Sequence, residues 1–181
     1  MKLIFIKYLK AFAIFSIVVC LTPATYAQST QLATEYVMTV FVQTDHRYAA
    51  DASTTVVEIK GGNVKGPNIQ GEIVLPGGDW IRTMSSGALR LDAKLMIKTD
   101  DGALIQMNYN GVVVGSKEAA EALAKGEVVT DKTFPYFITA PTFQTSSEKY
   151  GWLNKVQTIG KMIEVKRGDG SYVKYDIFIV R

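Results

Sequence analysis

The chain has 181 residues, which suits one domain, and its single histidine and single cysteine leave too few ligands for a zinc or copper site. Lys and Arg number 20 against 17 Asp and Glu, and three of the lysines fall within the first ten residues, so the rest of the chain is neutral. A neutral chain lacks the basic field that attracts nucleic acid, and its glycine-rich stretch has neither dinucleotide nor phosphate-loop spacing. We therefore expect no nucleic-acid partner, no metal and no cofactor.

The N-terminal segment has the layout of a secretory signal peptide. Its lysine-rich start precedes an apolar run from Ala11 to Leu21, and Thr25-Tyr26-Ala27 places small residues where signal peptidase reads. We expect cleavage at the end of this motif, which gives a signal peptide over residues 1–27, a disordered N-terminus over 28–33 and one domain over 34–181. The product is expected to be exported to the periplasm or the cell exterior.

Two alternatives to cleavage fit this segment less well. An uncleaved anchor needs roughly 20 helical residues to cross about 30 Å of hydrocarbon, and the apolar run is shorter, so we expect no stable membrane span after cleavage. A lipoprotein site at Cys20 needs small residues before the cysteine, whereas Val18 and Val19 stand there. Because Cys20 leaves with the leader, core packing without a disulfide must stabilise the domain.

Most of the remaining chain has strand character, with alternating apolar and polar residues between Gly, Pro and Asp turns. Gly61-Gly62 and Pro76-Gly77-Gly78 are expected to end strands, and Asp100-Asp101-Gly102 to form a hairpin turn. The predicted strands, in chain order, are Tyr36–Val42, Thr54–Ile59, Ile69–Leu75, Leu89–Lys98, Ala103–Val114, Tyr136–Phe143, Trp152–Ile159, Lys161–Lys166 and Tyr172–Val180.

One short helix is predicted from Ser116 to Lys125. Ser116 is a suitable N-cap, the segment is rich in alanine, and Gly126 can end the helix in the left-handed conformation. Many short strands with closely spaced turns indicate a mainly β fold, which we predict to be a single antiparallel β-barrel with this helix as a plug or lid.

Four motifs follow one another along the predicted barrel. They are Gly61-Gly62-Asn63-Val64-Lys65-Gly66-Pro67 with Gly71; Leu75-Pro76-Gly77-Gly78-Asp79-Trp80; Leu91-Asp92-Ala93 with Lys98 to Ile105; and Tyr136-Phe137, Thr139 to Phe143 and Tyr150 to Asn154. Their order and spacing resemble domain-of-unknown-function family 3237, also called uncharacterised protein family 0311, from about Glu35 to Val180. The resemblance implies an antiparallel β-barrel and homo-oligomers, and it supplies no substrate, cofactor or catalytic set. The chain departs from the pattern at Asn68, Gln70 and Ile138, where relatives often carry arginine.

The candidate ligand-binding residues are Trp80, Tyr136, Phe137, Trp152 and Asn154. Aromatic side chains inside a barrel can form a stacking wall for an apolar or aromatic ligand, and the amide of Asn154 could orient that ligand. Two alternatives stay open. The aromatic residues can be ordinary core, or they can form the contact surface of a homo-oligomer.

The candidate catalytic residue is Asp92, which lies mid-strand between Arg90 and Lys94. If its carboxyl faced the interior it could act as a general base, with Asn154 or Lys94 stabilising the developing negative charge. The alternative is a charged strand face in contact with solvent. His46, in a polar stretch, is expected in a surface loop.

These observations lead to one main hypothesis and one alternative. The main hypothesis is an exported β-barrel protein that binds a small apolar or aromatic molecule. The alternative is a cofactor-independent isomerase, lyase or hydrolase that uses Asp92 as its acid or base.

Overall fold

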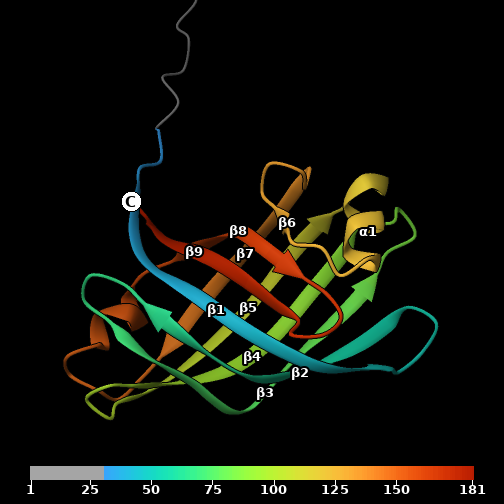
Figure 1. Ribbon diagram of the computed structural model, residues 1–181. Helices are drawn as coiled ribbons and strands as arrows, with labels where there is room; N and C mark the ends of the chain where they lie inside the picture. The colour runs from blue at the N-terminus through green and yellow to red at the C-terminus, as the bar shows by residue number, and fades with distance from the viewer. Residues whose placement is uncertain (1–30) are drawn as a thin grey trace, which may run out of the picture. The chain divides into compact units, whose positions relative to one another are not determined.

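Strands between Thr34 and Val180 form one antiparallel sheet that closes on itself (Figure 1). The computed structural model describes residues 31–181. Strand β8 pairs with β7 on one side and with β9 on the other, and β9 also pairs with β1, so the eight long strands complete a barrel. The predicted β-barrel is confirmed. The strands are β1 (Thr34–Ala49), β2 (Thr54–Lys65), β3 (Gln70–Thr83), β4 (Leu89–Thr99), β5 (Leu104–Val114), the short β6 (Val129–Thr130), β7 (Tyr136–Gln144), β8 (Thr158–Lys166) and β9 (Tyr172–Val180).

The alternation of β4 shows how the sequence sets the inside of the barrel. Leu91, Ala93, Leu95 and Ile97 are buried, and the residues between them face outward. Because successive side chains of a strand point to opposite faces, one apolar residue in two is enough to line the barrel. The large buried side chains, among them Met38, Met107 and Ile177, fill much of this interior.

Two segments that we expected to end strands instead lie inside them. The pairing of β2 with β3 shifts register between Glu58 and Gly62, and the pairing of β3 with β4 shifts between Val74 and Gly78. Register shifts of this kind bend long strands around a barrel. Gly62 has a φ of +136°, and a Cβ there would overlap the carbonyl oxygen of Phe41, so this bend requires glycine.

The predicted strand Trp152–Ile159 is wrong in its first half. Gly151–Lys155 forms a 3₁₀ helix, η1, and β8 begins only at Thr158. The chain crosses the end of the barrel at η1 and buries Leu153 there. A short apolar run in a sequence does not distinguish such a crossing from a strand. We call this end of the barrel the closed end.

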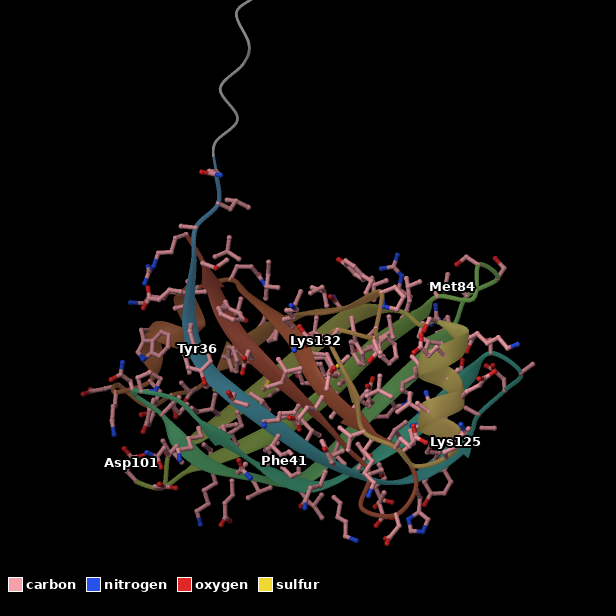
Figure 2. All side chains as sticks on the ribbon, turned by 45° about the horizontal axis from the view of Figure 1, so that its top comes forward. Tyr36, Phe41, Met84, Asp101, Lys125 and Lys132 are labelled. Carbon is pink, nitrogen blue, oxygen red and sulfur yellow. The ribbon has the colours of Figure 1, made fainter. Side chains whose placement is uncertain are left out.

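The predicted helix is confirmed as α1 (Lys117–Ala124). The backbone N–H of Ala119 donates to Ser116 Oγ at 3.0 Å, and Gly126 has a φ of +76°. Helix α1 buries Ala119 and Leu123 at the end of the barrel opposite η1, which we call the open end (Figure 1). Figure 2 shows this separation, with Asp101 at the closed end, and Lys125 and Met84 at the open end.

The predicted signal peptide lies outside the described residues. Ala33, which we assigned to a disordered N-terminus, already exchanges two backbone hydrogen bonds with Arg181, of 3.2 and 2.8 Å. Within residues 31–181, no helix is both long and apolar enough to cross a membrane.

Candidate functional site

A cavity of about 470 Å³ lies inside the barrel beneath α1. Its walls come from the inner face of the closed sheet, from the helix and from loops at the open end, and they are largely apolar. The apolar lining includes Val42, Ile59, Leu91, Val113, Leu123 and Phe137. Pockets of this size and character commonly hold small organic molecules.

Asp79 is the buried acidic residue of this cavity. It lies on β3 directly after the bend at Gly77 and Gly78, and only 8% of it is exposed. Its Oδ1 accepts one hydrogen bond, from the backbone N–H of Asp92 at 3.2 Å. Burial raises the pKa of Asp79 to about 6, although this hydrogen bond and the positive charge of Arg47 act in the opposite direction. The carboxyl can therefore gain or lose a proton near neutral pH.

Two buried tyrosines, Tyr109 on β5 and Tyr175 on β9, line the cavity with Asp79. Their ring centroids are 5.8 Å apart, and the ring of Phe137 meets that of Tyr175 edge-on at 5.7 Å. Burial raises the pKa of both phenols, and the negative charge of Asp79 raises the pKa of each further. Both hydroxyls thus stay protonated, and the two phenols hydrogen-bond with one another.

The mouth of the cavity carries three cationic side chains. Arg47 extends from the end of β1, and Lys166 and Arg167 come from the hairpin that joins β8 to β9. Burial and the charge of Arg167 lower the pKa of Arg47, whereas Asp79 raises it. An apolar chamber with a carboxyl and two phenols therefore opens through a basic mouth.

The structure does not gather the predicted aromatic residues around this cavity. Phe137 is a lining residue. Trp80 and Tyr136 are 46% and 48% exposed and lie outside the lining, and Trp152 belongs to η1 at the closed end. The side chain of Asn154 holds a loop instead, since Oδ1 accepts from the Thr145 N–H at 2.9 Å and Nδ2 donates to the Thr145 carbonyl at 2.8 Å.

Asp92 faces away from the cavity. Its side chain is 68% exposed, and its carboxylate lies 3.6 Å from Lys94 Nζ, in a solvent-facing ion pair. Its neighbours Leu91 and Ala93 point inward, so alternation directs Asp92 outward. Asp92 therefore lacks the inward orientation that an acid–base role requires, and that part of the prediction is wrong. Its backbone N–H instead donates to the carboxyl of Asp79, which does face inward.

The remaining predicted residue, His46, lies in strand β1 rather than in a loop. Its side chain is 67% exposed, and Nδ1 lies 3.4 Å from Glu58 and 3.5 Å from Asp45. Across residues 31–181, no group of three or more His, Cys, Asp or Glu residues is placed to hold a metal ion.

Asp79 was missed because it follows two glycines in a segment that we interpreted as a turn. The sequence nevertheless contained a signal for Asp79 in its strand alternation. In a strand that runs through the bend, Asp79 and Ile81 share one face, so a charged residue occupies a core-facing position. Such a position indicates a functional site more strongly than an acid on a charged strand face.

Comparisons with known proteins agree with this fold. The family described as protein of unknown function (DUF3237) matches residues 32–180. A UPF0311 protein of Rhodopseudomonas palustris is 34% identical over 133 residues, which cover 71% of this chain and 86% of that protein. The crystal structure of a conserved protein of unknown function from the same species has a TM-score of 0.75 at 29% identity, covering 84% of this chain and 99% of that chain. The hydroalkoxylation enzyme of Penicillium herquei is 33% identical over 103 residues, 56% of this chain and 52% of that protein.

Proposed function

The chain belongs to the DUF3237 family, and we propose that it binds a small, largely apolar or aromatic molecule inside the barrel. The observation that carries this proposal is the cavity of about 470 Å³ beneath α1, whose walls are mostly aliphatic and aromatic. A bound molecule would cover apolar wall that is otherwise in contact with water, at about 25 cal/mol for each Å² removed from solvent. The phenols of Tyr109 and Tyr175 would hydrogen-bond its polar atoms.

Binding can be tested with N-phenyl-1-naphthylamine, a neutral aromatic probe that fluoresces on leaving water. We expect a saturable rise in fluorescence with one site per chain. Ala120 of α1 lines the cavity, so Ala120→Trp narrows the mouth and should weaken binding by about tenfold or more.

Ala124→Trp is the matched control for this experiment. Ala124 lies one turn further along the same helix, is exposed and is not a lining residue. Binding by this variant should equal that of the wild type. Lack of saturable binding, or an equal loss in both variants, would remove the barrel interior as the binding site.

A second candidate function is cofactor-independent proton transfer, with Asp79 in the role that we first considered for Asp92. The observation in its favour is the buried Asp79 carboxyl, whose pKa is raised to about 6. A group with a pKa near the working pH serves as both acid and base. The relative from Penicillium herquei is named a hydroalkoxylation enzyme, and that name suggests the class of reaction.

Hydroalkoxylation adds the O–H of an alcohol across a C=C bond. The protonated carboxyl of Asp79 would give its proton to one alkene carbon while the alcohol oxygen bonds to the other carbon. The hydroxyl proton would then return to Asp79, so one C–O and one C–H bond form without an oxidant or a reductant. Tyr109 and Tyr175 would hydrogen-bond substrate oxygens and so orient the alcohol and the alkene for this addition.

This second function can be tested with a panel of unsaturated alcohols and phenols. A reaction appears as a product of unchanged mass and new chromatographic retention. Asp79→Asn should slow it by roughly 10²-fold or more, since removal of a general acid–base has that effect. If the wild type converts nothing, or Asp79→Asn retains full activity, the protein is a binding module or uses another residue.

Export, and assembly into a homo-oligomer, remain proposals from the sequence. Fractionation of bacteria that express the full chain, with intact mass of the product, tests cleavage. Light scattering of the purified protein tests assembly. A full-length cytoplasmic product would contradict export, and a monomer at micromolar concentration would contradict assembly.

A further inference from the structure

The basic mouth of the cavity is held in place by contacts between β1 and the β8–β9 loop. The backbone N–H of Thr44 donates to the Ser171 carbonyl at 3.0 Å, and the hydroxyls of the same two residues lie 2.8 Å apart. Thr44 lies three residues before Arg47, and Ser171 is the last residue of the β8–β9 loop that carries Arg167. The two arginines are thus brought to one side of the opening by strand pairing.

Within residues 31–181, no acid forms an ion pair with the cations of this mouth. Within the described part of the chain, Arg47, Lys166 and Arg167 each lack an ion pair within 4.0 Å. The acids of the cavity lining are Asp45, which lies 3.3 Å from Lys60 Nζ, and the buried Asp79. The lining therefore has an excess of positive charge where it opens to solvent.

The positive charges of Arg47 and Arg167 repel one another, and partial burial of Arg47 makes its charge less favourable still. An anion between them would relieve both effects. Guanidinium groups also suit this role because their fixed N–H donors bind the two oxygens of a carboxylate or a sulfonate together. A purely apolar ligand would make no use of these donors.

We infer that the natural ligand is an amphipathic organic anion, with its apolar body in the barrel and its anionic group between Arg47 and Arg167 at the mouth. This inference rests on the proposed binding function and specifies the class of ligand. The anionic end is held in contact with water, and the apolar end reaches toward Asp79, Tyr109 and Tyr175. The mouth therefore sets the orientation in which a ligand enters.

A matched pair of probes tests this inference. 1-Anilinonaphthalene-8-sulfonate has the ring system of N-phenyl-1-naphthylamine with one added sulfonate. We expect the anionic probe to bind at least about tenfold more tightly than the neutral one at low salt, because a charge-assisted bond to arginine is added. Its affinity should fall as salt rises, whereas the affinity of the neutral probe should not.

Variants at the mouth locate the anion. Arg47→Gln and Arg167→Gln should each weaken the anionic probe by about tenfold and leave the neutral probe unchanged. Lys98→Gln is the control, since Lys98 is an exposed cation on the outer face of β4, next to Glu72 and away from the mouth. It should change neither affinity.

The outcomes separate this inference from the proposed function. If the neutral probe does not bind, the binding function itself fails. If the neutral probe binds, and the anionic probe is no tighter or keeps its affinity in both arginine variants, the ligand class inferred here is wrong. Equal weakening of both probes by Arg47→Gln would assign Arg47 a structural role and also overturn the inference.

Discussion

Asp101 and Asp79 belong to opposite halves of the barrel, and their surroundings shift their pKa values in opposite directions. Asp101, at the closed end, accepts hydrogen bonds from Thr99 Oγ1 at 2.5 Å, Lys149 Nζ at 2.6 Å and the Tyr150 hydroxyl at 3.2 Å. These donors lower the pKa of Asp101 to about 2. Asp79 has a single backbone donor and is buried, and its pKa rises to about 6.

This contrast distinguishes a structural carboxylate from a functional one. At the closed end, the bonds from Lys149 and Tyr150 to Asp101 tie the turn that precedes η1 to the β4–β5 hairpin, so ionisation of Asp101 stabilises the fold. In the open half, ionisation of Asp79 works against folding because the charge is buried with few partners. A group that is retained at a cost to stability, and that faces a cavity, is a candidate for ligand binding or catalysis.

The largest effect that we predict is a loss of stability at the closed end. Tyr150 is buried in the core, its hydroxyl donates to Asp101, and Lys149 Nζ lies 4.9 Å from its ring centroid. Tyr150→Ala should lower the free energy of unfolding by about 3–5 kcal/mol, as measured by urea denaturation. Tyr150→Phe, which keeps the ring, should cost only about 1 kcal/mol.

The same variant tests whether the two ends are independent. The folded Tyr150→Ala protein should bind N-phenyl-1-naphthylamine as the wild type does, because distant sites contribute additively. Loss of probe binding under conditions where the variant remains folded would show that the closed end shapes the cavity.

The second prediction concerns the open half, where Asp79→Asn should increase stability at neutral pH. The folded state holds a proton on Asp79 that the unfolded chain releases near pH 4, so wild-type stability falls as pH rises from about 4 to about 6. The shift from 3.8 to about 6 corresponds to about 3 kcal/mol. Urea unfolding should show a gain of up to that size for the variant at pH 7.5, and little difference at pH 4.

A gain that is equally large at pH 4 would contradict this explanation, since the Asp79 carboxyl of the folded wild type is protonated there and as uncharged as the amide of the variant. Asp79→Asn would also separate Asp79 from Asp101 in a second way, because the variant combines increased stability with reduced acid–base function. Few substitutions in a barrel interior have this pair of effects.

Much of the fold could be predicted from the sequence, because period-two alternation is a local signal. The errors came where the backbone departs from a straight strand. The Gly61-Gly62 and Pro76-Gly78 segments are bends within β2 and β3, and only pairing with neighbouring strands shows that the ladder continues past them. The η1 segment contains Trp152 and Leu153, which also suit a strand, but it forms a 3₁₀ helix at the end of the barrel.

The site could be predicted far less well. Asp79, Tyr109 and Tyr175 lie on β3, β5 and β9, which do not pair directly with one another. Closure of the barrel brings these residues together, and no local pattern encodes that closure. Asp92 could have been excluded from the sequence, because the apolar residues on either side of it already occupy the inward face.

The third prediction is the counterpart of the second at the closed end. Asp101→Asn removes a carboxylate whose folded pKa is depressed to about 2, so the wild type gains stability from this group as pH rises from about 2 to about 4. The variant should be less stable than the wild type at pH 7, by less than Tyr150→Ala, and the difference should shrink as pH falls toward 2. Unfolding followed at several pH values measures this, and a difference independent of pH would assign the loss to geometry rather than to charge.

The smallest predicted effect is at Asp92, which is the matched control for Asp79. Both residues are aspartates where β3 pairs with β4, since Asp79 pairs with Ala93 next to Asp92, but one carboxyl faces the cavity and the other faces solvent. Asp92→Asn removes an exposed ion pair with Lys94 and leaves the backbone N–H that donates to Asp79. We therefore expect stability within about 0.5 kcal/mol of the wild type and unchanged probe binding and turnover. If Asp92→Asn instead reduced turnover as strongly as Asp79→Asn, the chemistry would lie outside the barrel, and the distinction between the two aspartates would be wrong.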